Sequence, residues 1–69
     1  MKRMKLEING EIREIAPVSN VWELMQLLGV ARGPVAVEVN RNIIRRADWE
    51  KTPIADLDRV EIVQFVGGG

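Results

Sequence analysis

Cysteine and histidine are both absent from this chain of 69 residues. Disulfides, thiolate nucleophiles, the usual zinc sites and Ser-His-Asp or Cys-His catalytic groups each require one of these side chains, so the sequence excludes all of them. Only carboxylates, lysines and arginines remain for catalysis, and no pair of them stands at a spacing that suggests a site. We therefore predict that the protein is not itself an enzyme, binds no metal and holds no cofactor of its own.

An excess of either charge is absent too, because ten basic residues balance ten acidic ones. Nucleic-acid binding needs a one-sided positive field, and single-strand binders also stack bases on aromatic rings. Aromatic rings are few: Trp22, Trp49 and Phe65. No apolar run approaches membrane-spanning length. Residues 1–5 include three basic side chains, but no hydrophobic signal core follows them. We predict a soluble cytoplasmic protein that contacts neither nucleic acid nor membrane.

The start of the chain predicts a β-hairpin. Apolar residues alternate with polar ones there: Met4, Leu6 and Ile8. Asn9-Gly10 follows at once and favours the positive φ angles of a type I′ turn. The return strand, residues 11–16, is less regular, because Ile12 and Ile15 would face opposite sides of it. Either a bulge intervenes or one isoleucine is exposed.

A helix is predicted after this hairpin. Ser19 and Asn20 both suit an N-cap, and Glu23 stands three residues after Asn20 as in a loose capping box. An apolar stripe follows at helical spacing: Val21, Leu24, Met25 and Leu28, widened by Leu27. Gly29 suits a left-handed C-cap. A helix of about three turns is unstable alone in water, so we expect its stripe to cover a sheet.

Extended pieces and turns make up the next part of the chain. A third strand is predicted by alternating apolar residues: Val35, Val37 and Val39. Residues 40–42 form a turn, and residues 43–44 a short extended piece. We interpret Trp49 as a flap over the edge of the core rather than a ligand platform. Ile54 and Leu57 are expected to anchor an irregular turn before the last strand.

The last strand, residues 60–66, passes directly into three glycines: Gly67, Gly68 and Gly69. Three extended residues span roughly 10 Å and carry no Cβ, so such a tail can enter a narrow channel. It could carry a terminal carboxylate into another protein's active site. A frayed end has the same composition, so the glycines alone leave both interpretations open. We predict a single domain over residues 1–66 and a flexible tail over residues 67–69.

The order of hairpin, helix, two extended pieces and last strand predicts an α+β fold. One helix can then cross one face of a mixed sheet of about four to five strands, which is the β-grasp arrangement. If the first and last strands are neighbours at the centre, they run parallel. The tail then leaves from the middle of the sheet's end.

Several segments together resemble one family. They are Ile8-Asn9-Gly10-Glu11, residues 21–28, residues 35–40, residues 46–49, and above all residues 58–69 with the ending Val-Glu-Ile-Val-Gln-Phe-Val-Gly-Gly-Gly. This pattern resembles the ThiS family, the sulfur carriers of thiamin biosynthesis within the ubiquitin-like MoaD/ThiS group, over nearly the whole chain. Two residues depart from it. Arg45 stands where the family commonly has proline, and Leu57 where it has glycine in an Asp-Gly-Asp turn.

The resemblance implies that Gly69 is the chemical site. In the family a ThiF-type activating enzyme uses ATP and magnesium to join the terminal carboxylate to AMP. A persulfide donor then supplies sulfur, and the resulting thiocarboxylate passes it to a ThiG-type thiazole synthase. The protein would thus be the carried substrate and not the catalyst, and a monomer when free.

A partner-docking surface is predicted beside the tail. If Val60 and Ile62 face the core, alternation directs the intervening residues to the opposite face. The predicted partner-binding residues are Glu61, Val63, Phe65 and Val66. An exposed apolar cluster of this kind suggests a footprint for the activating enzyme and the synthase. Alternatively, Phe65 folds back on the sheet and matters only for stability.

Two other functions fit the same residues. A sulfur carrier of another pathway, such as the small subunit of molybdopterin synthase, would have the same fold and tail. A noncovalent ubiquitin-like interaction module would bind through its sheet face and leave the glycines passive.

Overall fold

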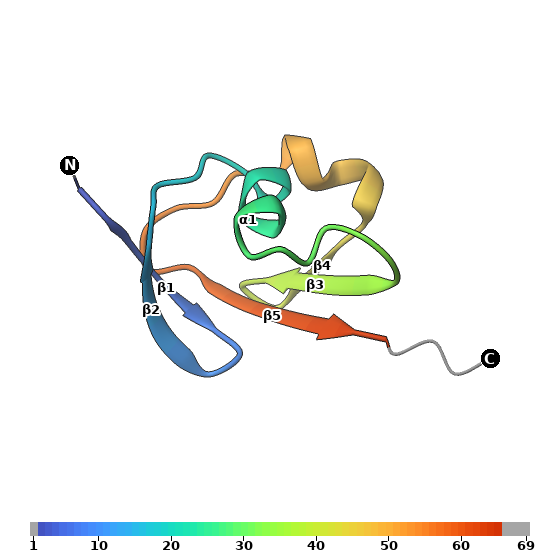
Figure 1. Ribbon diagram of the computed structural model, residues 1–69, viewed down its shortest axis with the longest axis horizontal. Helices are drawn as coiled ribbons and strands as arrows, with labels where there is room; N and C mark the ends of the chain where they lie inside the picture. Colours follow the sequence, from blue (N-terminus) through green and yellow to red (C-terminus); the bar gives the residue numbers. More distant parts are fainter. Residues whose placement is uncertain (1, 66–69) are drawn as a thin grey trace.

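The computed structural model describes residues 2–65, which form a five-stranded sheet in the order β2-β1-β5-β3-β4. The elements in chain order are β1 (Met4–Ile8), β2 (Glu11–Ile15), α1 (Val21–Leu27), β3 (Val35–Val39), β4 (Asn42–Ile44), the 3₁₀-helix η1 (Arg46–Lys51) and β5 (Arg59–Gln64). Both helices lie on the same side of the sheet (Figure 1). This is the predicted β-grasp arrangement. The division between residues 66 and 67 and the predicted flexible tail lie outside the described residues.

Strand β5 occupies the centre of the sheet. It pairs in parallel with β1, where Glu7 is opposite Arg59 and Ile8 is opposite Val60. On its other side it pairs antiparallel with β3, from Val39 opposite Val60 to Val35 opposite Gln64. The first and last strands are thus neighbours at the centre of the sheet, and they run parallel, as expected for that case.

The β1–β2 hairpin has the predicted turn. Asn9 and Gly10 have φ angles of 50° and 83°, as a type I′ turn requires. The register runs one to one from Ile8 opposite Glu11 to Met4 opposite Ile15, with no bulge. Ile15 is consequently buried and Ile12 is exposed on the other face. Of the two alternatives for the return strand, the exposed isoleucine is the one adopted.

Helix α1 begins at the predicted cap. The Asn20 Oδ1 atom accepts a hydrogen bond of 2.8 Å from the Glu23 backbone N–H. The Glu23 carboxylate in turn accepts one of 2.7 Å from the N–H of Ser19, one residue before the cap, so the capping box is indeed a loose one. Gly29 has a φ of 74° just past the helix, as predicted for a left-handed C-cap.

Two details of the helix prediction were wrong. The helix has seven residues, about two turns rather than three. Leu27 is 47% exposed and does not widen the buried stripe of Val21, Leu24 and Met25. At 100° per residue Leu27 lies roughly 110° around the helix from the centre of that stripe, so it projects beside the sheet and not onto it.

One hydrophobic core fills the space between the sheet and the helices. Its buried members are Leu6, Ile8, Ile15, Val21, Leu24, Met25, Val37, Val39, Trp49, Ile54 and Val60. Trp49 belongs fully to this core, which corrects its interpretation as a flap over the core edge. The ring can be buried because its Nε1–H donates a hydrogen bond of 3.3 Å to the Ile44 carbonyl. No polar or charged residue among residues 2–65 is buried.

The turn before β5 also differs from the prediction. Ile54 is buried as expected, but Leu57 is 71% exposed and anchors nothing with its side chain. Backbone bonds hold this turn instead. The Leu57 N–H donates to the Lys5 carbonyl at 2.6 Å, and the Lys5 N–H donates to the Asp56 carboxylate at 2.7 Å. Because the chain is fixed by polar contacts, the leucine side chain is left in solvent.

The two residues that depart from the family pattern have the backbone angles expected of the residues they replace. Arg45 has φ of −70° and ψ of 149°, which proline adopts without strain. Leu57 has a φ of 71°, in the left-handed region that favours glycine. Both residues therefore keep the backbone that the more usual residue prefers.

Candidate docking face and C-terminal tail

Strand β5 lies in the centre of the sheet and is the last element before the predicted chemical site in the sequence (Figure 1). Gly67, Gly68 and Gly69 lie outside the described residues, as does Val66. Their roles stay predictions. What the structure describes is the root from which the tail extends, which ends at Phe65.

The root of the tail is held from both sides. On the β1 side, the Asn9 side-chain amide accepts a hydrogen bond of 2.7 Å from the Ile62 N–H and donates one of 3.1 Å to the Ile62 carbonyl. On the β3 side, the Phe65 N–H donates a bond of 3.0 Å to the Pro34 carbonyl. Asn9 thus acts like one more strand residue after β1 has turned away, and the loop before β3 continues the pairing of β5 past Gln64.

Apolar side chains are exposed on the face of β5 opposite the core. Val63 is 54% exposed and Phe65 is 57% exposed, whereas Val60 is fully buried on the other face. Phe65 therefore does not fold back into the core. Since burial does not explain these two side chains, they are available for contact with another molecule.

Neighbouring strands enlarge this apolar area. Ala36 is directly opposite Val63, and Pro34 accepts the backbone bond from Phe65. On β4, Ile43 is directly opposite Glu38 of β3 and is 75% exposed on the same outer face. We call these residues the outer apolar patch: Pro34, Ala36, Ile43, Val63 and Phe65. The sequence analysis missed the first three, because only the register of β3 with β4 and β5 brings them together.

Charged residues border the outer apolar patch. Glu61, a predicted partner-binding residue, is directly opposite Glu38 and lies 3.8 Å from the Arg59 guanidinium. Arg59 is also 3.3 Å from Glu7. One guanidinium therefore serves two carboxylates, and the cross-strand pair of glutamates is mildly unfavourable. Because the side chains of these ion pairs are partly exposed to solvent, the pairs add little to stability.

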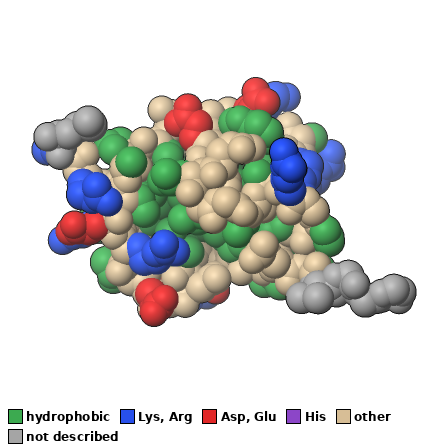
Figure 2. Space-filling view, in the orientation of Figure 1, with side chains coloured by type: hydrophobic (Ala, Val, Ile, Leu, Met, Phe, Trp, Pro, Cys, Tyr) green, Lys and Arg blue, Asp and Glu red, His purple; other side chains and the backbone are tan. Residues whose placement is uncertain are grey.

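Elsewhere the described surface also exposes apolar side chains, namely Ile12, Trp22, Leu27 and Leu57. Basic and acidic side chains are interspersed on the face seen in Figure 2, without a large area of one sign. Among residues 2–65 no group of three His, Cys, Asp or Glu side chains is placed to hold a metal ion. In the same part of the chain, no helix is both long and apolar enough to cross a membrane.

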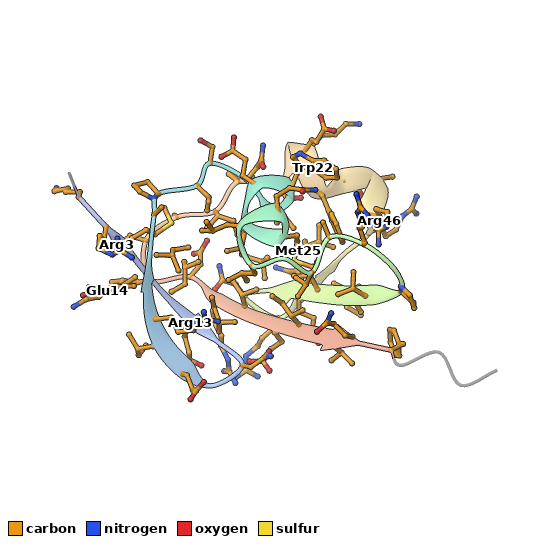
Figure 3. The ribbon with its side chains drawn as sticks, viewed as in Figure 1. Arg3, Arg13, Glu14, Trp22, Met25 and Arg46 are labelled. Carbon is orange, nitrogen blue, oxygen red and sulfur yellow. The ribbon has the colours of Figure 1, made fainter. Side chains whose placement is uncertain are left out.

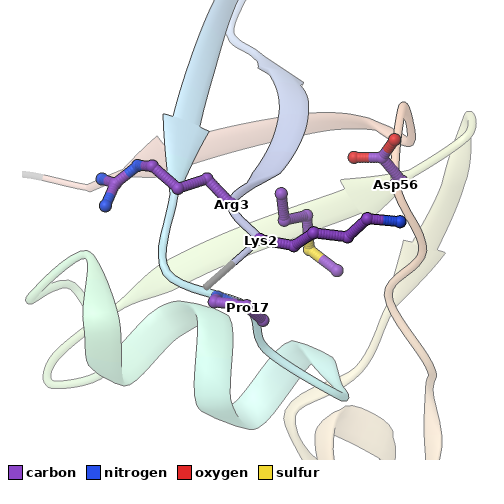
Figure 4. A pocket seen from close by; sticks show the side chains of 5 residues that line it. Lys2, Arg3, Pro17 and Asp56 are labelled. Atoms are coloured by element: carbon purple, nitrogen blue, oxygen red, sulfur yellow. The ribbon is translucent and has the colours of Figure 1, made fainter.

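An open cavity of about 350 Å³ lies near the start of β1 (Figure 4). Its lining residues are Lys2, Arg3, Met4, Pro17 and Asp56. The Asp56 carboxylate already accepts the hydrogen bond from the Lys5 backbone. The first three lining residues lie at the beginning of β1, Pro17 follows β2 and Asp56 lies in the turn before β5. Since β1 and β5 run parallel, the cavity is at the end of the sheet opposite the tail, and we do not assign it to the candidate site.

Comparisons with known proteins agree with this geometry. The model of the ThiS family matches residues 6–69. A thiazole synthase of Paramagnetospirillum magneticum is 42% identical over 66 residues, which cover 96% of this chain and 20% of that protein. A thiazole synthase of Magnetococcus marinus is 33% identical, again over 96% of this chain and 20% of the relative. The chain thus spans about a fifth of the length of these two relatives.

Smaller relatives match along their whole length. The sulfur carrier protein ThiS of Bacillus subtilis is 31% identical over 93% of this chain and 98% of its own. A crystal structure of a thiamine biosynthesis protein (ThiS) from Geobacter metallireducens superposes with a TM-score of 0.79 at 36% identity, covering 96% of this chain and all of that one. With the same five-stranded sheet and a family match from residue 6 to residue 69, the chain belongs to the ThiS family of sulfur carriers.

Proposed function

We propose that this protein carries sulfur for thiazole formation in thiamin biosynthesis, with the α-carboxylate of Gly69 as the loading point. It acts as the substrate of other enzymes and not as a catalyst. The observation that carries the proposal is the family match over residues 6–69, which includes all three final glycines. The chemistry requires the polypeptide to end at Gly69, because only a free carboxylate can be activated.

The proposed chemistry follows from the weak reactivity of a carboxylate. Its delocalised charge makes it a poor electrophile, so a ThiF-type enzyme joins it to AMP, with ATP and magnesium bound on that enzyme and pyrophosphate released. A persulfide sulfur attacks the activated carbonyl carbon and expels AMP. A thiol then cleaves the resulting S–S bond, and a thiocarboxylate remains on Gly69. Because the chain has no cysteine, sulfur can reside on its terminus but on no side-chain thiol.

A ThiG-type thiazole synthase is the proposed acceptor of the sulfur. Two relatives are themselves named thiazole synthase and match this chain over a fifth of their length. That similarity favours the thiamin pathway over a carrier of the molybdopterin-synthase type. We further propose that the free carrier is a monomer in the cytoplasm, as expected from its composition.

The outer apolar patch is the proposed docking surface for these enzymes. Val63 and Phe65 provide exposed apolar contacts next to the root of the tail, with Glu61 beside them. A partner enzyme bound there contacts Phe65, while the four residues after Phe65 extend toward the active site of that enzyme. Four extended residues reach roughly 13 Å, enough to cross the wall of a catalytic pocket.

The decisive experiment is an intact-mass measurement. The chain is incubated with a ThiF-type enzyme, ATP and a persulfide sulfur source, next to a variant lacking Gly69. We expect a mass increase equal to the exchange of one oxygen for one sulfur, in the intact chain alone. No change, with the activating enzyme proven active on another carrier, would contradict the proposal.

An interaction module is the remaining alternative, since the outer apolar patch could also bind a partner noncovalently. One added residue after Gly69 separates the two functions. For a carrier, this extension abolishes adenylation because the activated carboxylate moves one residue too far. For a binding module, it leaves partner affinity unchanged. Calorimetric titration with each candidate partner, run beside the mass assay, gives both values.

A further inference from the structure

The guanidinium of Arg46 makes an unusual number of contacts for an exposed side chain. It stacks over the Trp49 ring at 4.4 Å from the ring centroid. Its Nη1 donates a hydrogen bond of 2.7 Å to the Ala31 carbonyl, and its Nη2 donates one of 2.7 Å to the Gly33 carbonyl. Arg46 therefore connects the beginning of η1 to the loop between α1 and β3 (Figure 3).

That loop supplies the last backbone partner of β5 among the described residues. Pro34, next to Gly33, accepts the hydrogen bond from the Phe65 N–H. Gly33 itself has a φ of 80°, so the loop reaches Pro34 through a left-handed residue. A shift of the two carbonyls that Arg46 holds would move the acceptor at Pro34 and, with it, the direction of the chain at Phe65.

The anchor on the other side of Arg46 is rigid. Trp49 is buried in the core, and its Nε1–H is bonded to the Ile44 carbonyl. The two carbonyls require two donors in a fixed fork, which the planar guanidinium provides and a lysine ammonium does not. Through its stacking on Trp49, Arg46 thus fixes the loop of residues 31–34 in place relative to the core.

We propose that Arg46 is a positioning residue for the tail: by holding the loop of residues 31–34, it sets the direction in which the chain leaves β5 toward Gly69. The inference rests on the proposed carrier function. Arg46 itself need not touch the partner or the reacting atoms. It acts on the geometry of the carboxylate in the enzyme's active site, where misplacement by about 1 Å can lower a rate by up to about a hundredfold.

Adenylation kinetics test this role. The full chain, Arg46→Ala and Arg46→Lys are compared as substrates of the adenylating enzyme, with Arg45→Ala as the matched control. Arg45 is the neighbouring exposed arginine, and its side chain makes no hydrogen bond or ion pair to residues 2–65. For both Arg46 variants we expect kcat to fall on the order of tenfold with KM little changed, because the outer apolar patch is intact. Arg45→Ala should behave like the unaltered chain.

Amide hydrogen exchange provides the readout that is independent of activity. In Arg46→Ala the Phe65 amide should exchange at least about tenfold faster, while the amide of the buried residue Val21, which donates to the Thr52 carbonyl, keeps its rate. A uniform increase over the sheet would mean that Arg46 only stabilises the fold and would overturn the inference. So would an unchanged kcat, or a raised KM alone, since the latter belongs to docking.

The two proposals fail in different ways. If the unaltered chain is not adenylated by a competent enzyme, the carrier function is contradicted. The exchange rate of the Phe65 amide in Arg46→Ala then decides by itself whether Arg46 holds the root of the tail. An unchanged rate overturns the inference under either outcome.

Discussion

The two faces of this sheet carry alternate residues of the same strands, but one face is buried and the other is exposed. The inner face, under α1 and η1, contributes the buried cluster that includes Leu6, Val37 and Val60. The outer face has no cover among residues 2–65, yet it exposes Ile43, Val63 and Phe65. Inner apolar residues are needed because they fold the domain. Outer apolar residues are not, and this difference points to contact with a partner.

The strongest way to test this comparison is to remove an inner side chain. Leu24→Ala, on the buried stripe of α1, should lower the free energy of unfolding by about 2–5 kcal/mol. That is a large part of the total stability of a domain this small, which is roughly 3–10 kcal/mol. Leu27→Ala on the same helix is the matched control, and its half-exposed side chain should contribute less than about 1 kcal/mol. Urea unfolding measures both, and equal losses would contradict the assignment of faces.

The outer face should show the reverse behaviour. Phe65→Ala should weaken binding to the activating enzyme by about 2 kcal/mol and change stability by less than about 1 kcal/mol. Ile12→Ala is the control, since Ile12 is exposed on the outer face of β2, away from the tail. Titration calorimetry and thermal unfolding give the two quantities. The docking proposal fails if Phe65→Ala leaves the partner affinity unchanged, whether or not the melting temperature falls.

A third variant tests the two hydrogen bonds between the Asn9 side chain and the Ile62 backbone, which belong to neither face of the sheet. Asn9→Ala removes both side-chain bonds to Ile62 and puts alanine, which tolerates the left-handed region less well than asparagine, at a φ of 50°. We expect a loss of about 1–2 kcal/mol, of which the hydrogen bonds supply most. Asn9→Gly keeps the turn without strain but lacks the amide. A similar loss in both variants, measured by chemical denaturation, assigns the effect to the bonds, whereas no loss in Asn9→Gly would show that they contribute nothing.

The smallest effect is expected at the turn before β5. Leu57→Gly should raise stability by about 0.5 kcal/mol, because relief of about 1–2 kcal/mol of left-handed strain exceeds the greater entropy of glycine in the unfolded chain. The melting temperature should rise by about 2–4 °C. Leu57→Ala loses the same exposed side chain and keeps the strain, so it should not rise. An equal gain in both would attribute the effect to the leucine side chain and not to the backbone.

Much of the fold could be predicted because its signals are local. The Asn9-Gly10 turn, the cap at Asn20 and the alternation in β3 each depend on residues only a few positions apart. The errors concern residues whose surroundings come from distant segments. Leu27 and Leu57 are apolar but exposed, whereas Trp49 is buried where η1 packs against α1, with its ring 6.4 Å from that of Trp22 between centroids.

The candidate site divides in the same way. Val63 and Phe65 could be placed on the outer face by counting along β5, since alternation depends only on the strand itself. Ala36 and Ile43 could not be added to them without the register of three strands. The clamp of Arg46 on the carbonyls of residues 31 and 33 had no sequence signal, because backbone carbonyls are the same at every position.

The sequence by itself determined the five strands, the helix after the hairpin and their order, together with the balance of charges, but not the 3₁₀-helix η1. Helical spacing, strand alternation and turn residues act over a few positions, so these features can be deduced without knowing the fold. Only the tertiary structure decided how the root of the tail is held. Asn9 meets Ile62 across 53 residues, and Arg46 meets Gly33 across 13, through side-chain groups that many other partners could have satisfied. Packing selects one partner among them, because only the assembled core fixes the distances that a hydrogen bond requires.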